Sequence, residues 1–306
     1  MTDELPEVEL PRGVALAWGV AANPQRGPKR ELSIERIVDA AVAIADADGL
    51  GAVSMSAIAN ALGFTTMSLY RYVTAKDDLI LLMQEHGIGL PSAAIAAAPD
   101  WRTGLTLWAR ESLESYVAHP WLVDIPILGS PVTPNNLAWM DAALAVLEGT
   151  PLSAEERVGA LLLVSGQTRW RASIERGYDI SNSSLGMTPE ERDQADAHVI
   201  MTLVTEEQFP ALYAAVRAGA LGPDEQNPFE FGLSRVLDGI GAYMDALGGP
   251  NPKSAAEPPG TTDAHPKDER VKLARQTRRE AEKRLREAEK AEREAIKAAV
   301  ERAKRG

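Results

Sequence analysis

Residues 54–73 read SMSAIANALGFTTMSLYRYV, and this stretch decides the fold of the N-terminal part of the chain. Its first apolar residues recur with the three- and four-residue spacing of one helix face, at Met55, Ile58, Ala59 and Leu62. Gly63 follows, at the position where a left-handed residue ends a helix with least strain. The next threonines can cap a second helix, which Leu69 and Val73 would anchor in the same core. The stretch therefore predicts two short helices joined by a tight glycine turn.

On the second of these helices, the side chains that would face solvent can bind DNA. They are Thr66, Met67, Tyr70 and Arg71. Arginine can bond a guanine edge, methionine and threonine methyl groups can contact thymine, and tyrosine can bond a phosphate. The alternative is a helical hairpin that packs in a core and touches no DNA. Residues 28–86 hold five Lys and Arg against eight Asp and Glu, which favours that alternative. Local potential rather than net charge governs phosphate contact, however, so the sequence favours a helix-turn-helix.

The remainder of the chain predicts an all-α protein. A helical pattern begins after Ser33, its expected N-cap, and ends at Gly49. Aromatic residues make up only 5%, alanine is abundant, and no two-residue strand period competes with the helical one. Further helices are predicted over residues 54–62, 66–73, 76–89, 101–118, 134–148, 154–176, 188–205, 209–219 and 228–247.

The run from Ile34 through Leu82 resembles the DNA-binding domain of the TetR family of bacterial repressors. That family has a glycine after its first helix, an A..LG turn, an LY.Y/H recognition helix and a lysine that opens its fourth helix. This chain matches the pattern in order with Gly49 and Gly51, Ala59, Leu62 and Gly63, Leu69 to Tyr72, and Lys76. The resemblance implies that one set of residues faces operator DNA: Thr65, Thr66, Met67, Ser68, Tyr70, Arg71 and Tyr72.

The resemblance also assigns phosphate contacts outside this helix. Lys76, with the positive end of the helix that it opens, would bind a phosphate. Many relatives carry arginine near the start of the second helix, where this chain has Ser56 and Ala57. Base reading from that helix is therefore not expected, although Ser54 or Ser56 could bond phosphate.

The second half of the chain predicts a sensing and dimerisation domain. His119 to Leu122 and Pro134 to Leu147 resemble the C-terminal domain of one TetR branch, a helical bundle that holds a ligand and pairs two subunits. By this resemblance, helices near 154–176 and 228–247 would form a four-helix homodimer interface. The residues predicted to line the ligand pocket are Trp108, Glu111, Tyr116, Trp139, Met140, Trp170 and Met201, with ordinary core packing as the alternative for each. Interior acids such as Glu111 or Asp141 would favour a cationic ligand.

Composition excludes several other functions. Cysteine is absent, which removes thiolate metal sites and cysteine nucleophiles. The four histidines lack metal-ligand spacing, and neither a phosphate loop nor a nucleophile elbow occurs, so we expect no enzyme, metal or cofactor. No apolar run approaches about 18 residues, so we expect no membrane span. Without a signal peptide, the expected location is the cytoplasm.

Charge and composition divide the 306 residues into five segments. We expect a flexible N-terminal arm (1–32), a helix-turn-helix domain (33–82), a ligand-binding and dimerisation domain (83–247), a proline-rich linker (248–266) and a charged helical tail (267–306). The arm could insert Arg26 into an A·T-rich minor groove, or could simply be solvated. The tail holds 15 Lys and Arg against 9 Asp and Glu, which fits either a solvated helix or nonspecific DNA contact.

These observations predict a dimeric transcription regulator that binds a palindromic operator in double-stranded DNA. Its two recognition helices must lie about 34–36 Å apart to enter successive major grooves. A small-molecule effector that prefers a different spacing would release the operator. The alternative is a ligand-independent dimer that organises DNA or scaffolds proteins through the head and the basic tail.

Overall fold

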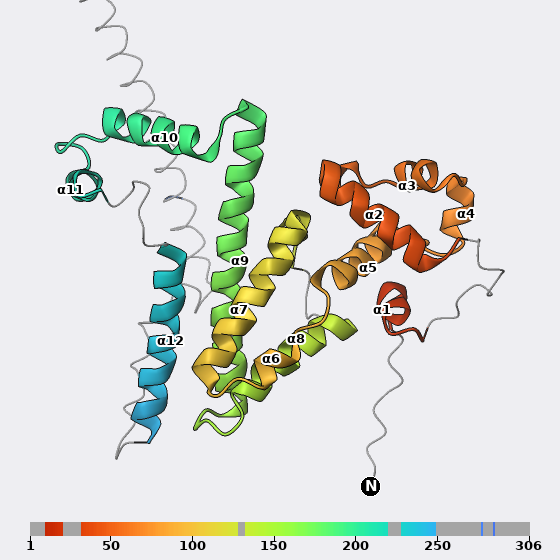
Figure 1. The fold of residues 1–306 in the computed structure, drawn as a ribbon, viewed down its shortest axis with the longest axis horizontal. Helices are drawn as coiled ribbons and strands as arrows, with labels where there is room; N and C mark the ends of the chain where they lie inside the picture. The colour runs from red at the N-terminus through yellow and green to blue at the C-terminus, as the bar shows by residue number, and fades with distance from the viewer. Residues whose placement is uncertain are drawn as a thin grey trace, which may run out of the picture. The chain divides into compact units, whose positions relative to one another are not determined.

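The computed structural model describes residues 10–20, 32–127, 132–219 and 228–248, together with Thr277 and Arg284. Every regular element in these ranges is a helix, so the all-α prediction is confirmed (Figure 1). Met1–Gly249 forms one compact unit and Pro250–Gly306 a second. The predicted linker and charged tail lie outside the described residues except at Gly248, Thr277 and Arg284, and so does Arg26.

The helix-turn-helix predicted from the sequence belongs to a small helical head. Its elements are α2 (Ile34–Asp48), η1 (Leu50–Ala52), α3 (Met55–Leu62), α4 (Thr66–Tyr70) and α5 (Lys76–Ile88). The anchors predicted for α4, Leu69 and Val73, are both fully buried, and Ile37 of α2 and Ile58 of α3 meet them in one core. The head therefore closes around residues that the apolar spacing singled out.

Caps and a glycine set the ends of the head helices. The Ser33 hydroxyl accepts a hydrogen bond from the Arg36 amide at 3.3 Å, as expected for the N-cap of α2. Gly63 ends α3 in the left-handed region, at φ 73°. Thr65 then caps α4 by accepting a hydrogen bond from the Ser68 amide at 3.3 Å. The predicted turn between the two short helices is thus confirmed.

The N-terminal arm was wrongly predicted to be flexible at residues 12–17, because these form helix α1 (Arg12–Ala17). Helix α1 packs on α5, with Val14 buried and Leu16 and Ala17 against the head core (Figure 1). The Trp18 indole donates a hydrogen bond to the Val132 carbonyl at 2.8 Å. The run is too short to show a helical period, and so short a helix depends on tertiary contacts, chiefly its docking on α5.

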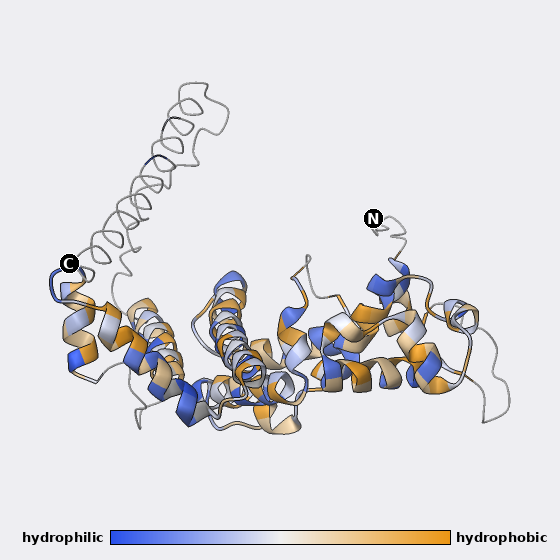
Figure 2. Cartoon of the chain, turned by 90° about the horizontal axis from the view of Figure 1, so that it is seen from above, coloured by the Kyte–Doolittle hydropathy of each residue, from blue (hydrophilic) through white to orange (hydrophobic). Residues whose placement is uncertain are grey.

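The larger domain packs on α5 and surrounds a second core. Helix α5 leads into α6 (Ala93–Ala96) and α7 (Trp101–Ala118), and then η2 (Pro120–Asp124), α8 (Pro134–Val146) and α9 (Ala154–Leu185) follow. Beyond α9 come α10 (Pro189–Leu203), α11 (Pro210–Arg217) and α12 (Pro228–Leu247). Helices α9 and α12 lie side by side with opposite directions (Figure 1), and hydrophobic and hydrophilic residues occur on both (Figure 2).

Helix α9 is longer than the predicted 154–176 because Gly177 does not end it. A glycine inside a helix costs about 1 kcal/mol without breaking it. Gly186, in contrast, adopts a φ of 64° in the left-handed region and directly follows the last helical residue. The helix therefore ends where the backbone enters the left-handed region.

The docking of α1 can be tested by placing a charge at its buried contact. In Val14→Asp a carboxylate would have to enter the apolar contact with α5, which costs far more than the about 1.5–3 kcal/mol that a buried valine contributes. We expect hydrogen exchange at residues 12–17 to lose its protection. Val20→Asp is the matched control, since Val20 is 67% exposed. Unchanged protection in Val14→Asp would show that α1 does not depend on this contact.

The left-handed turn at Gly63 gives a second test. A Cβ at Gly63 or at Gly51 meets no atom within 4 Å, but only Gly63 has a positive φ. Gly63→Ala should therefore lower the opening free energy of the head by about 1–2 kcal/mol, while Gly51→Ala should not. Hydrogen exchange of the α3 amides measures this opening. Equal effects in both variants would contradict the argument.

Candidate DNA interface and ligand cavity

The exposed side of α4 carries the side chains expected to read DNA. Met67 is 74% exposed and Tyr70 45%, and Arg71 is exposed at the end of the helix. Thr66 is half-buried at its start. Because Leu69 alone of this helix is buried, α4 presents most of its surface to solvent. This surface is long enough to place several side chains against a groove edge.

A hollow of about 380 Å³ lies beside this surface, between α3, α4 and α5. Five of the predicted DNA-binding residues line it: Ser54, Ser56, Thr66, Tyr70 and Lys76. Lys76 opens α5, whose N-cap Ala75 makes no side-chain cap. The first amides of α5 are therefore available beside a lysine, a combination that favours a phosphate. The structure thus brings the proposed phosphate contacts together on one side of the head.

Three other predicted residues have structural roles as well. The Thr65 and Ser68 hydroxyls lie 2.9 Å apart and bond each other, and Thr65 also caps α4. Tyr72 is half-buried and packs against the head core. The resemblance placed all three against DNA, and in this structure each also holds α4 in position.

A cavity of about 400 Å³ lies in the larger domain, between three helices. Helix α7 contributes Arg102, Thr106, Ala109, Arg110 and Leu113. Helix α9 contributes Gln167, Thr168 and Arg171. Helix α12 contributes Phe229, Glu230, Leu233, Ser234 and Leu237. Its volume is in the range of small-molecule sites, and its lining mixes apolar and cationic side chains.

None of the seven residues predicted to line a pocket lines this cavity. Trp108 and Trp139 are buried and pack edge to face at 5.6 Å, and the Trp108 indole donates to the Trp139 carbonyl at 2.8 Å. Tyr116 and Met140 are half-buried against the two cores. Trp170 and Met201 are 60% and 61% exposed.

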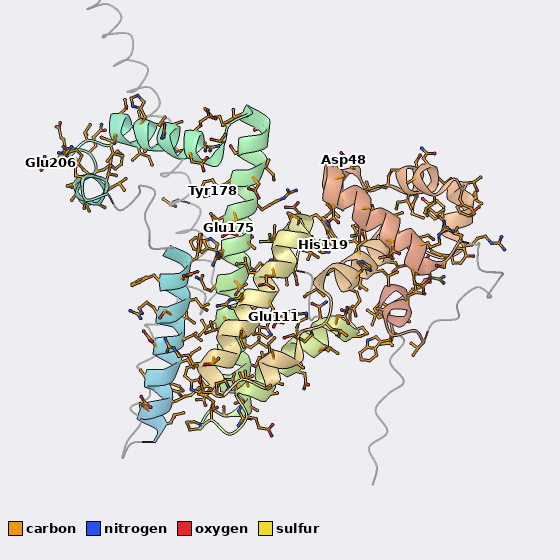
Figure 3. The ribbon with its side chains drawn as sticks, in the orientation of Figure 1. Asp48, Glu111, His119, Glu175, Tyr178 and Glu206 are labelled. Atoms are coloured by element: carbon orange, nitrogen blue, oxygen red, sulfur yellow. The ribbon has the colours of Figure 1, made fainter. Side chains whose placement is uncertain are left out.

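Glu111 is also used elsewhere, since its carboxylate accepts hydrogen bonds from the amide and hydroxyl of Ser92 (Figure 3). Trp108, Trp139 and Trp170 were predicted to line a pocket because large aromatic side chains are common in pockets. A better signal was available on α7. There Arg102, Thr106, Arg110 and Leu113 recur at helical spacing, and this stripe faces the cavity.

Charged side chains at the cavity are partly paired. Arg102 donates to Asp238 at 2.5 Å, and this hydrogen bond holds the pKa of Asp238 below its usual value. Near the other end of α12, Tyr243 donates to Glu156, which raises the pKa of the Tyr243 hydroxyl. These two contacts tie α12 to α7 and to α9.

One carboxylate of the head binds the corner of the larger domain. Asp46 of α2 accepts the Trp121 indole N–H at 2.6 Å, and the His119 Nδ1 lies 2.9 Å from the same oxygen (Figure 3). Both residues belong to the corner where α7 passes into η2. Arg169 of α9 holds this corner from the opposite side, donating to the carbonyls of Val123 at 3.0 Å and Ile125 at 2.6 Å. Helices α2 and α9 are thus connected through η2.

Metal-ligating clusters and membrane-spanning helices are both absent from the described part of the chain. No cluster of three or more His, Asp or Glu side chains there could hold a metal ion. None of the described helices is long and apolar enough to cross a membrane.

Comparison with known proteins agrees with this architecture. Residues 37–83 match the model described as "Bacterial regulatory proteins, tetR family", and residues 96–244 match "Tetracyclin repressor-like, C-terminal domain". The HTH-type transcriptional repressor DrrR1 of Streptomyces coeruleorubidus is 35% identical over 238 residues, which cover 76% of this chain and 86% of that protein. An HTH-type transcriptional regulator of Saccharopolyspora erythraea is 27% identical over 218 residues, which cover 71% of this chain and 88% of that protein.

Solved structures show the same fold. ActR of Streptomyces coelicolor in complex with actinorhodin aligns with a TM-score of 0.57 at 24% identity, over 71% of this chain and 97% of that one. Apo ActR of Streptomyces coelicolor aligns with a TM-score of 0.56 at 23% identity, over 72% of this chain and 99% of that one. Together with the family matches and the identity to DrrR1, the helix-turn-helix head and helical sensing domain show that this chain belongs to the TetR family of bacterial DNA-binding transcriptional regulators.

Proposed function

We propose that the protein is a homodimeric repressor that binds a palindromic operator through α4 and leaves it when a small molecule occupies the cavity between α7, α9 and α12. The observation that carries the DNA-binding part is the hollow where Thr66, Tyr70 and Lys76 meet beside the exposed side of α4. Arg71 and Met67 would contact base edges, and Ser54, Ser56 and Lys76 would contact phosphates. Acting on bacterial DNA, the protein would work in the cytoplasm.

An exposed apolar face on α9 and α12 supports the homodimer. Leu163 and Trp170 of α9 are 58% and 60% exposed, and Phe231 of α12 is 59% exposed. At the same helical spacing on α9, Cβ atoms at Gly159 and Gly166 would meet nothing within 4 Å, so a partner helix could approach closely. Two-fold pairing of this face would form a four-helix interface of the kind expected from the sequence.

The route between the cavity and DNA supports release by an effector. Thr168 of α9 lines the cavity, and the next residue, Arg169, holds η2 by two carbonyls. Trp121 of η2 in turn bonds Asp46 in the head. A molecule that fits a shifted α9 would therefore move the two heads and change the spacing of their recognition helices. Ligand and operator would then weaken each other's binding by the same factor. ActR, which shares the fold, has been solved with actinorhodin bound.

Selection of bound sequences from random duplex DNA tests the DNA interface. We expect the protein to enrich a palindrome. On that palindrome Lys76→Gln should lower the slope of log affinity against log salt by about 1, because one phosphate contact is lost. Arg71→Gln should weaken specific binding by about 1–3 kcal/mol and relax one base position. Arg217→Gln, an exposed arginine on α11, is the control. A folded dimer that enriches no sequence would instead favour the scaffold function.

The dimer interface is tested by a charge on the exposed apolar face. Leu163→Glu would bring two carboxylates into a two-fold interface, so we expect monomers by sedimentation velocity and loss of operator binding. Leu90→Glu is the control, since Leu90 is 72% exposed and lies between α5 and α6. A dimer that survives Leu163→Glu unchanged would place the interface elsewhere.

A further inference from the structure

The cavity between α7, α9 and α12 has apolar walls and cationic groups with unused donors. Ala109, Leu113, Phe229, Leu233 and Leu237 form an apolar surface that suits a planar hydrophobic molecule. Three arginines and only one acid, Glu230, share the rest of the lining with small polar side chains. This excess of cations is local, because the whole chain carries a net charge of −12.

The three arginines differ in how far they are satisfied. Arg102 uses only one terminal nitrogen, Nη2, which donates to Asp238 of α12 at 2.5 Å and to the Ser234 carbonyl at 3.3 Å. Arg171 uses only its Nε, which donates to Glu175 at 2.8 Å, so its two terminal nitrogens have no acceptor within the described ranges. Arg110 has neither an ion pair nor a hydrogen bond with any described residue. All three guanidinium groups therefore retain donors at the cavity, and the two that make no ion pair with α12, those of Arg110 and Arg171, come one from α7 and one from α9.

Two nearby acids pair with cavity arginines, Asp238 with Arg102 and Glu175 with Arg171, but neither acid lines the cavity. Asp238 is shared, because Arg235 also approaches its carboxylate at 2.5 Å. Glu230 is exposed at the start of α12. Glu111, which the sequence suggested as a binding site for a cationic ligand, is bonded to Ser92 and does not line the cavity. A cationic ligand would thus meet three arginines against a single lining acid, Glu230.

Two of the three hydroxyl groups at the cavity, those of Thr106 and Thr168, donate to their own helices, and the third, that of Ser234, accepts from Arg102. The Thr106 hydroxyl donates to the Arg102 carbonyl at 2.8 Å, and the Thr168 hydroxyl donates to the Val164 carbonyl at 2.9 Å. The Gln167 amide nitrogen donates to the Phe229 carbonyl at 2.9 Å. The strongest donors left for a ligand are therefore the two arginines, which bind carboxylate-like oxygens in a bidentate manner.

We propose that the effector is an aromatic acid: a planar apolar ring system that bears an ionised group, such as a carboxylate or an acidic phenol, held between Arg110 and Arg171. The ring system packs on the apolar wall, where Phe229 already lies under the Arg171 guanidinium at 5.8 Å. This inference rests on the proposed function, since it names the ligand class of the same cavity.

Two fluorescent probes with the same aromatic frame separate charge from shape. Anilinonaphthalene sulfonate carries a permanent anion, and phenylnaphthylamine is its neutral counterpart. We expect the dimer to bind the sulfonate more tightly. Arg171→Gln should weaken sulfonate binding about tenfold, and Arg110→Gln, at a more exposed position, about threefold, while both leave phenylnaphthylamine within about twofold. Glu175→Gln, which releases the Nε of Arg171, should not weaken sulfonate binding.

Arg217→Gln serves as the control for a lost surface arginine, and circular dichroism with sedimentation checks that each variant is a folded dimer. An affinity for the sulfonate that falls only in the cavity variants supports the inference. Equal affinity for the two probes, or sulfonate binding unchanged in the Arg110→Gln, Arg171→Gln double variant, overturns it.

Leu113→Trp distinguishes this inference from the proposed function, because the larger side chain fills the cavity and should weaken both probes. If it weakens phenylnaphthylamine while the arginine variants leave the sulfonate unchanged, the cavity remains the ligand site and the aromatic-acid inference fails. If it alters neither probe, the cavity is not the ligand site, and both the inference and the effector part of the proposed function fail.

Discussion

The carboxylate of Asp46 is the contact on which the arrangement of the two domains depends. It lies on the first helix of the head and accepts the Trp121 indole N–H, with His119 beside it. Trp121 is itself fully buried and lies so close to α5 that a Cβ on Gly87 would come within 3.2 Å of its ring. Trp121, Leu122 and Ile125 are buried in the head core, so moving the corner away from α2 would expose apolar surface as well as break this hydrogen bond. The hydrogen bond to Asp46 therefore fixes the position of an apolar contact between the two domains.

The corner at η2 connects the head to helix α9 of the larger domain. Arg169 fixes η2 to α9, and Arg176 of the same helix lies 3.5 Å from Asp124. Glu85 of α5 accepts a hydrogen bond from the Asn135 amide, near the start of α8, at 2.6 Å. This bond holds α5 against the larger domain. Packed helices joined in this way tend to move as rigid bodies between discrete positions. In the proposed function, this is the route by which an effector that displaces α9 would move the head.

Local signals predicted the head well and the cavity poorly. Ser33, Gly63 and Thr65 act on their own helices, so their roles could be inferred from neighbouring residues alone. The cavity lining comes from three helices far apart in the chain, and which face of each helix turns inward depends on tertiary packing. Trp108 and Trp139 pack edge to face in the core, where the Trp108 indole donates to the Trp139 carbonyl and the Trp139 indole to the Gly89 carbonyl, and the arginine stripe of α7 faces the cavity instead. Helix α1 was missed for a related reason, since six residues acquire their stability from α5.

The position of Lys76 has a practical consequence for following the protein on DNA. It is the only lysine between residues 30 and 248, and it lines the hollow beside α4. An amine-reactive reagent would therefore modify the body of the protein at a single side chain, and that side chain belongs to the proposed interface. Acylation of one peptide, read by mass spectrometry, becomes a footprint of operator occupancy that requires neither a labelled duplex nor an engineered residue.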